Sequence, residues 1–465
     1  ETHDITIWNA YFVPQTMTSV TEVSTDGIDL SEPVTIPYEM AALEEITYEA
    51  SVTMSGPSTI GATIYFNFPA LFPDSTLYCM IVGSRVMIWL WKPEGDYTEE
   101  LRWNTNILQT RSGEQRISFL EAPRQAFNYE FFRPPTEIAE IKAAVDDRCH
   151  GIWGVPVWKE HAVVTATVGS SAINFDTSYA DYQEEGWAIL WESPEKAAAV
   201  YITTVRVDGI DIDPVLGESF ENAWIMPMQR AYTPEGIEFT RSEGTWTRFT
   251  GQFLCIDNVD LATTSTYPQY RSHDVLTDGN YVIGNMSERI MRPIAQIDNG
   301  QGPITVIATQ DYTNFARSLG TSTTTKAALW AWRQWLHARR GRWKPFWLPT
   351  RNQDFVLAAT ITALTTDIEI TGGAMFARHN VFPCDFMMTL TNGNTYYRRI
   401  LTATTAPGGN TTMSIDSALG VEVAASAISQ WCLMDLVRLN SDEITLEHSN
   451  PYNMETNIPV MRVVE

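Results

Sequence analysis

The sequence predicts a mainly β protein with a few helices, a β-rich α+β fold: an N-terminal β-sandwich followed by two duplicated β modules that each carry one helix. Most of the chain consists of short segments in which apolar and polar residues alternate, separated by turn residues such as Asp26-Gly27, and this is the pattern of β-strands. Two helical patterns interrupt it, and an extended segment with proline and aromatic residues follows each. Matching segments also recur in the same order in two parts of the chain.

Residues 1–95 are expected to form the N-terminal sandwich. The segments EITYEASVTM and TIYFNF alternate, and YCMIVGSRVMIWLW is rich in β-branched and aromatic residues. Turn residues at Gly56-Pro57 and Pro73-Asp74 separate these segments. Several short strands at this spacing are typical of a small β-sandwich. The polar stretch at 92–100 is expected to be an exposed connection.

Residues 96–240 are expected to form the first β module. Two strand-like segments, GEQRISFLEA and RQAFNYEFF, precede a helix that is expected to follow Pro134-Pro135, with Thr136 as its N-cap. Gly151 is expected to end this helix. Its apolar residues recur at the helical spacings of three and four. They are Ile138, Ile141, Ala144 and Val145.

Residues 241–450 are expected to form the second β module, with its helix over the segment TKAALWAWRQWLHARR, from Thr325 to Arg340. The following segment GRWKPFWLPT contains two prolines and cannot continue the helix, so it is expected to turn into an extended edge. Residues 451–465 are expected to be a short polar tail that ends in an apolar, strand-like patch able to pair with a neighbour.

The two modules are predicted to be copies of one ancestral module. Matches in the same order favour duplication over coincidence, and the insertions between them fall in loops, where insertions are tolerated. The matches are Ile107-Leu108 with Val275-Leu276, Arg116-Ile117 with Arg289-Ile290, Pro156 with Pro349, Val163-Val164 with Val356-Leu357, and WIMPMQRAYTPEGIEF with WCLMDLVRLNSDEITL.

The second module differs from the first in its charge. No acidic residue occurs between Asp311 and Asp354, whereas the equivalent stretch of the first module carries several. We expect this basic stretch to contact an acidic surface of a neighbouring subunit or domain. The alternatives are a solvated helix face and a nucleic-acid patch, and the net charge of −25 disfavours the second. The candidate interface residues are Arg333, Arg339, Arg340, Arg342, Lys344 and Arg351.

The same stretch holds five of the chain's 16 tryptophans. Aromatic residues beside arginine are typical of cores and buried interfaces. We therefore expect these rings to anchor helix to sheet, or subunit to subunit, in preference to lining a ligand site. The candidate anchors are Trp330, Trp335, Trp343 and Trp347 in the second module and Trp153 and Trp158 in the first.

The sequence contains no motif for catalysis, cofactor binding or metal binding. GxSxG, P-loop, GxGxxG, CxxC and HExxH patterns are absent. Asp208, Asp211 and Asp213 lack the later glutamate that completes a calcium loop. A pair of glycan-cleaving carboxylates from distant positions stays open. We expect no enzyme activity, no cofactor and no metal.

Composition describes a globular protein with an ample core, 44% hydrophobic and 19% charged. Five widely spaced cysteines argue against a disulfide framework and favour folding in a reducing compartment. No apolar run approaches the length of a membrane span. No signal peptide is expected, and the chain, which lacks an initiator methionine, is expected to be trimmed.

Three stretches together resemble structural proteins encoded in the tail modules of long-tailed bacteriophages, above all minor tail proteins of the tail tip or baseplate. They are WNAYFVPQTMTSVTEVSTDGIDL, ELRWNTNILQTRSGEQRISFLEAPRQAFNYEF and LWAWRQWLHARRGRWKPFWLPTRNQDF. The resemblance covers most of the chain, and its most specific parts are RSGEQR…APR and RRGRWKPFWLPT. It brings no catalytic residues.

The resemblance implies a virion protein that assembles into a homo-oligomeric ring in the bacterial cytoplasm and connects the tail tube to central tip proteins or fibres. The expected partners are further copies of the chain and other tail proteins such as tube, hub or fibre. Sequence-specific nucleic-acid binding and membrane insertion are not expected, although DNA passes through such a channel, where an acidic surface prevents adhesion. The alternative is a glycan-binding or glycan-cleaving component that recognises the host receptor.

Overall fold

A computed structural model describes residues 2–52, 59–68, 77–84, 86–241, 246–277, 288–379, 382–406 and 409–464. Strands predominate in it, so the predicted mainly β class is confirmed. The helices of this described part are α1 (Pro135–Arg148), α2 (Lys326–Arg339) and the short α3 (Ala374–His379), and none is long and apolar enough to span a bilayer. The predicted turns at Gly56-Pro57 and Pro73-Asp74 lie outside the described residues.

The chain divides into two compact units. Unit 1 comprises Glu1–Tyr97 and Ala126–Asp257, and unit 2 comprises Thr98–Gln125 and Asn258–Glu465. The predicted boundaries at 95/96 and 240/241 are therefore corrected. Residues 98–125 belong with the second module, and the first module continues to Asp257 because its last strand completes its sheet.

Unit 1 begins with the predicted sandwich. Two three-stranded antiparallel sheets, β1-β6-β4 and β3-β7-β8, share one core, and a short β2-β5 ladder accompanies them. Ile46 and Tyr48 from the first sheet meet Ile64 and Phe66 from the second in this core. The strands are β1 (Thr2–Trp8), β2 (Gln15–Met17), β3 (Ser19–Val23), β4 (Ile28–Leu30), β5 (Tyr38–Met40), β6 (Glu45–Val52), β7 (Thr59–Asn67) and β8 (Leu77–Ser84).

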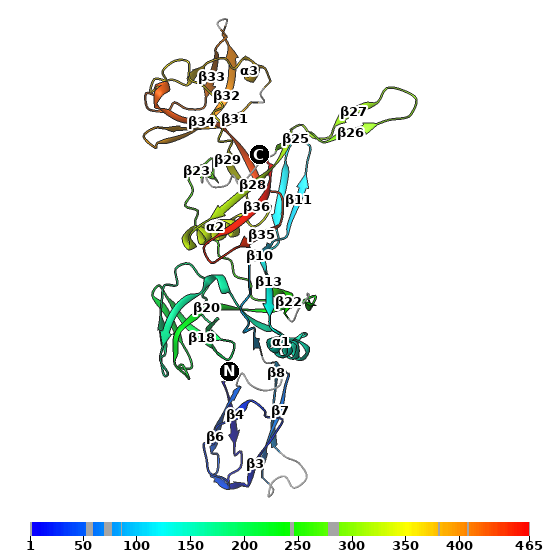
Figure 1. The fold of residues 1–465 in the computed structure, drawn as a ribbon, viewed down its shortest axis with the longest axis vertical. Helices are drawn as coiled ribbons and strands as arrows, with labels where there is room; N and C mark the ends of the chain where they lie inside the picture. The colour runs from blue at the N-terminus through cyan, green and yellow to red at the C-terminus, as the bar shows by residue number, and fades with distance from the viewer. Residues whose placement is uncertain are drawn as a thin grey trace. The chain divides into compact units, whose positions relative to one another are not determined.

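The rest of unit 1 is the first β module, in which α1 connects strand β13 to β14 (Figure 1). Pairings run β13-β22-β20-β14 on one side and β20-β17-β18-β19-β16 on the other. The strands are β9 (Met87–Ile88), β13 (Arg124–Arg133), β14 (Trp153–Pro156), β15 (Ala162–Ala166), β16 (Ala172–Asn174), β17 (Trp187–Ser193), β18 (Lys196–Arg206), β19 (Gly209–Ile212), β20 (Phe220–Tyr232), β21 (Ile237–Arg241) and β22 (Thr247–Cys255).

Helix α1 begins two residues earlier than predicted. Pro134 is its N-cap, Pro135 its first residue, and the cap makes no side-chain hydrogen bond. Thr136 therefore lies inside the helix and is not the cap. Proline at the first helical position has its φ already set and loses no needed N–H, so the Pro-Pro pair itself defines the start. The helix ends at Arg148, and Gly151 donates its N–H to the Arg148 carbonyl just beyond it.

Unit 2 is the second β module and repeats the pairing order of the first. Helix α2 connects β28 to β29, and pairings run β28-β36-β34-β29 on one side and β34-β31-β32-β33-β30 on the other. The strands are β10 (Tyr97–Arg102), β11 (Thr105–Gln109), β12 (Glu114–Ser118), β23 (Gln269–Tyr270), β24 (His273–Asp274), β25 (Glu288–Met291), β26 (Ile294–Ile297), β27 (Thr305–Ala308), β28 (Asn314–Thr323), β29 (Phe346–Pro349), β30 (Asp367–Ile370), β31 (Cys384–Leu390), β32 (Thr395–Thr405), β33 (Thr411–Ile415), β34 (Ile428–Leu439), β35 (Glu443–His448) and β36 (Met454–Arg462).

This shared order is consistent with the predicted duplication, but two of the predicted matches are wrong, because Ile107-Leu108 and Arg116-Ile117 lie in the same unit as their supposed counterparts. In unit 1, β9 pairs in parallel with β14, and Trp89 donates its N–H to the Gly154 carbonyl at 2.8 Å. In unit 2, Leu276 donates its N–H to the Trp347 carbonyl at 2.9 Å in the same position. The counterpart of Val275-Leu276 is thus Ile88-Trp89. Ile107-Leu108 belongs instead to the β11–β12 hairpin.

The predicted polar tail is a central strand. β36 pairs with β28 from Ala316↔Met461 to Thr323↔Met454, and it also pairs with β34 and β35. Met454, Ile458 and Val460 on this strand are buried in the core of unit 2. Every second residue from Met454 to Val460 is buried, so one face of the strand enters the core while Glu455 and Asn457 on the exposed face contribute to the polar composition of the segment.

Helix α2 covers this core. Leu329, Trp332, Trp335 and Leu336 face buried residues of β28, β29, β34 and β36. The predicted packing of one helix on the sheet of the module is therefore observed in unit 2. The residues of the basic stretch are distributed around and just after this helix.

Candidate functional site

Helix α2 and the turn after it determine in which directions the side chains of the predicted basic residues point. Thr325 caps the helix by accepting the Ala328 N–H at 3.2 Å. At the other end Arg340 and Gly341 both have positive φ, 51° and 64°. A side chain at Gly341 would collide with the Asp442 carboxylate. This left-handed turn sends Arg339, Arg340 and Arg342 toward different partners.

Arg333 enters a buried polar cluster. Its Nη2 lies 2.9 Å from Oε1 of Glu99, and the two side chains are 2% and 0% exposed. The same carboxylate accepts the Gln125 side-chain amide at 2.6 Å, and its Oε2 lies 3.1 Å from Nε2 of His448. Strand β10, helix α2 and strand β35 thereby meet at one carboxylate.

Arg339 enters a second buried pair. Its Nη2 donates to Oδ2 of Asp274 at 2.5 Å and its Nη1 donates to the Pro345 carbonyl at 3.2 Å. Burial lowers the pKa of the Arg339 guanidinium, and the Asp274 carboxylate opposes this shift. The guanidinium also lies 5.4 Å from the Trp335 ring. Together these contacts tie the helix end to strand β24.

Arg340, Arg342 and Lys344 are less buried than these two. Arg340 donates to Asp260 at 3.1 Å. Arg342 donates through Nε to Oδ2 of Asp442 at 2.9 Å, and its backbone N–H donates to Oδ1 at 3.0 Å. Lys344 is exposed. Burial chiefly, with the neighbouring arginines, lowers the pKa of its ammonium.

The expectation of an intersubunit basic surface is therefore corrected in part. Arg333 and Arg339 are enclosed by carboxylates of their own unit, which are distant in sequence, so they offer no surface to another subunit. For Arg340, Arg342, Lys344 and Arg351, of which Arg351 bonds the Thr277 carbonyl, the interface stays a prediction.

The predicted aromatic anchors divide into two groups. Trp335, Trp347, Trp153 and Trp158 are buried in cores. Trp330 and Trp343 are half-buried, and their rings lie against cations: Arg333 is 5.4 Å from Trp330, and Lys344 is 4.9 Å from Trp343. The buried rings hold each module together, whereas the other two lie near the charged ends of basic side chains.

Asp442 is expected to make the stability of unit 2 depend on pH in the acid range. Burial raises the pKa of this carboxyl, but bonds from Arg342 and Thr105 outweigh that effect and leave the pKa below its usual value. Its contribution is therefore complete above the unfolded pKa of about 3.9 and is lost as the pH falls through the lower, folded pKa. Asp442→Asn should cost about 1.5 kcal/mol or more at pH 7.

Urea unfolding at a series of pH values checks this expectation. The difference between Asp442→Asn and the parent should shrink below about pH 4. Asp311→Asn removes an exposed pair with Arg111 and should change stability by less than about 1 kcal/mol at every pH. A constant difference down to acid pH would contradict the role assigned to Asp442.

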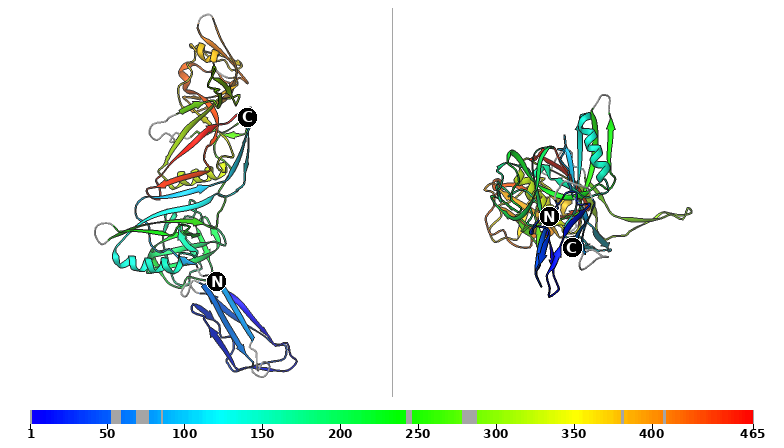
Figure 2. Two further views of the ribbon diagram at one scale, coloured as in Figure 1. Left: turned by 90° about the vertical axis from the view of Figure 1, so that its right-hand side faces the viewer. Right: turned by 90° about the horizontal axis from the view of Figure 1, so that it is seen from below.

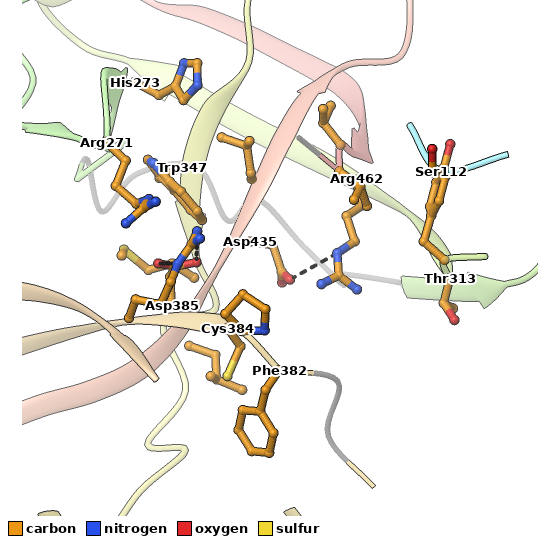
Figure 3. A pocket seen from close by; sticks show the side chains of 18 of the residues that line it. Ser112, Arg271, His273, Thr313, Trp347, Phe382, Cys384, Asp385, Asp435 and Arg462 are labelled. Carbon is orange, nitrogen blue, oxygen red and sulfur yellow. Dashed lines mark hydrogen bonds and ion pairs between the residues drawn. The ribbon is translucent and has the colours of Figure 1, made fainter. Parts of the chain in front are cut away.

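A second feature of unit 2 is a polar pocket of about 1040 Å³ (Figure 3). Arg271, Trp347 and Asp385 lie on one side of it and Arg462 on the other, with Asp435 between them. Arg399 forms two 2.9 Å bonds with Asp385. Of the residues predicted from the sequence, Trp347 alone lines the pocket.

The acidic groups of the pocket are held by arginines and by a tyrosine. The Tyr270 hydroxyl donates to Asp385 at 2.7 Å. Burial, followed by this bond, raises the pKa of Tyr270. Asp435 lies 3.3 Å from Arg317 and 4.0 Å from Arg462, yet burial raises the pKa of its carboxyl. Within the described part of the chain, no group of three or more metal-ligating side chains comes together.

The third feature is the β26–β27 hairpin, which projects from its unit in both Figure 1 and Figure 2. We call residues 294–308 the arm. Its apolar side chains are 47% to 57% exposed: Ile294, Ile297, Ile304, Val306 and Ile307. The register pairs Ala295 with Ile307 and Gln296 with Val306, so apolar residues occur on both faces. Asp298 is its one charged residue.

The sequence analysis missed both the pocket and the arm. The signal for the arm was present, because the segment IAQIDNGQGPITVIA contains two short apolar strands around a turn with Gly and Pro. Exposure of both faces has no signature in the sequence. The pocket combines residues of nine separated segments, so no local pattern indicates it.

A scan against models of known protein families finds no match for the chain, and a search of curated proteins finds none either.

Proposed function

We propose that the chain is a structural subunit that assembles with further copies of itself, and that the assembly belongs to the tail tip or baseplate of a long-tailed bacteriophage. The arm carries the first part of this proposal. The resemblance of three stretches to minor tail proteins supports the second part.

Exposure of the apolar side chains of the arm to water is energetically unfavourable. A two-stranded hairpin is at best marginally stable alone, and exposed apolar side chains on two faces stabilise it only when other surfaces cover them. The cores of both β modules are closed without it. The arm is therefore dispensable for folding and suited to contact other subunits.

Charge favours this segment as the place where copies meet. Two chains with a net charge of −25 repel each other over most of their surfaces. A nearly uncharged, apolar arm adds contact area without bringing like charges together. A ring in which each arm lies on the next subunit is consistent with the predicted connection between tail tube and tip proteins.

Removal of the arm is expected to abolish assembly and to leave the fold intact. The Thr309 N–H donates to the Pro293 carbonyl at 3.0 Å, so the ends of the arm already meet. Replacing residues 294–308 by a two-residue Asn-Gly turn should therefore preserve unit 2. Sedimentation velocity should show oligomers for the parent and monomers for the deletion variant, with the same melting temperature.

Point variants give the matched control. Ile307→Glu places a charge on an apolar position of the arm and should also prevent assembly, whereas Thr305→Glu places the same charge on a polar, exposed position and should weaken it less. Unchanged oligomers after removal of the arm would overturn self-assembly through it.

Antibody labelling of phage particles should decorate the tail end, and particles without label would overturn the tail assignment.

A further inference from the structure

The pocket of unit 2 contains positive charge that the described residues of the chain do not neutralise. Its carboxylates already have arginine partners: Asp385 has Arg399, Asp435 has Arg317 and Arg462, and Asp311 has Arg111. Two lining arginines remain. Arg292 donates to the Gln310 carbonyl at 2.8 Å, and neither Arg292 nor Arg271 forms an ion pair with any described residue.

Arg271 is presented by an unfavourable turn. It links β23 to β24 together with Ser272, and the two residues have φ of 46° and 67°. A two-residue hairpin turn with positive φ at both positions normally uses Asn-Gly, because most side chains strain there. The turn therefore holds an exposed arginine at the pocket in a conformation that glycine would adopt at lower cost (Figure 3).

Part of the pocket wall is apolar, next to polar residues such as Ser112 and Thr313. Phe382 and Pro383 come from the segment before β31, Leu433, Met434 and Leu436 lie on β34, and Val463 and Val464 follow β36. A ligand that fills this space needs apolar groups next to its negative charges. An inorganic anion lacks the apolar groups, and a long nucleic acid is repelled by a protein with a net charge of −25.

We propose that this pocket binds an acidic, partly apolar peptide segment of a partner protein, with the carboxylates of the segment facing Arg271 and Arg292. A guanidinium matches a carboxylate with two parallel hydrogen bonds, and such charge-assisted bonds are strong. Asp385 and Asp435 do not repel the segment, because arginines that flank them offset their charges. The proposal rests on the pocket alone and is independent of the arm.

Fluorescence anisotropy with the full chain tests the proposal. The probe is a fluorescein-labelled peptide of sequence Glu-Ile-Glu-Val-Glu-Leu, and the control peptide carries Gln in place of each Glu. The acidic peptide should bind saturably, and the control about tenfold more weakly or less, equivalent to about 1.4 kcal/mol. Added salt should weaken the acidic peptide's binding.

Arg271→Gly separates binding from folding. It should weaken binding about tenfold while the melting temperature stays the same or rises, because glycine relieves the left-handed strain. Arg292→Ala should also weaken binding. Arg289→Ala removes an exposed arginine that does not line the pocket and should leave the affinity unchanged.

Three results would overturn the proposal: no saturable binding of the acidic peptide, equal binding of the Gln peptide, or unchanged affinity in both the Arg271→Gly and Arg292→Ala variants. Complete competition by inorganic phosphate at the peptide's own concentration would do the same, because it would identify a site for small anions. Loss of assembly in arm variants, with peptide binding retained, would leave this proposal standing.

Discussion

Glu99→Ala is expected to lower the free energy of unfolding of unit 2 by about 3–5 kcal/mol, the usual cost of removing one partner from a buried ion pair. Glu99 is fully buried and lies 2.9 Å from Arg333, which is 2% exposed. The variant leaves the guanidinium of Arg333 facing a cavity where its counter-charge was. It also removes the acceptor of the Gln125 amide and the group that faces His448.

Urea unfolding followed by tryptophan fluorescence measures this effect, because Trp332 and Trp335 lie in the same unit. Glu121→Ala is the matched control. Its carboxylate lies 3.8 Å from Arg340 but is 87% exposed, so the expected change is about 0.5 kcal/mol or less. Equal unfolding midpoints for Glu99→Ala and Glu121→Ala would contradict a stabilising role for the buried cluster.

A double variant examines the cause of the loss. Glu99→Leu combined with Arg333→Met removes both charges and keeps most of the side-chain volume. Because burying two charges is itself costly, this variant should be more stable than Glu99→Ala. If the double variant is as unstable as the single one, the loss comes from packing or from His448 and not from removal of the Glu99 charge beside Arg333.

Trp335→Ala is expected to destabilise unit 2 by a similar amount, about 3–5 kcal/mol, through loss of buried surface and formation of a cavity. The Trp335 ring lies 4.7 Å from Trp332 and 5.0 Å from Phe346. It therefore connects helix α2 to strand β29. Arg339 lies over the same ring, so the variant also loosens the second buried ion pair.

Thermal unfolding followed by circular dichroism provides the measurement, and Trp330→Ala provides the control from the same helix. Trp330 is half-buried and lies outside the core clusters, so its removal should cost about 1 kcal/mol. A melting temperature for Trp335→Ala equal to that of the parent would show that this ring does not stabilise the unit.

Local sequence patterns predicted several elements of the fold. Alternation within segments such as EITYEASV predicted strands that are present, and the spacing of Ile138 and Ile141 predicted the buried face of α1. The pattern was less informative where polar residues alternate with apolar ones at the chain end. Composition predicts a polar tail at 451–465 that ends in a strand-like patch, whereas the full strand over Met454–Arg462 and its buried face are recognisable only when its neighbours β28 and β34 are known.

The basic stretch shows why functional sites are harder to predict from the local sequence than strands and helices are. The local sequence contains no acid near Arg333 or Arg339, and this predicts a partner on another subunit or domain. The partner of Arg333 is 234 positions away and that of Arg339 is 65 positions away. Residues that are far apart in the sequence become neighbours once strands pair across the chain. The neutralisation of Arg333 and Arg339 by distant carboxylates therefore could not be predicted from the local sequence.

By itself, then, the sequence determined the class of the protein, the existence of its two long helices and the buried face of α1, because these depend on periodicity and on proline and glycine within a few residues. Tertiary structure decided which charges are neutralised, which strands close each unit, and which surfaces stay open. Those properties depend on side chains brought together by long-range strand pairing, which is why the arm and the arginine-lined pocket became visible only in the folded chain.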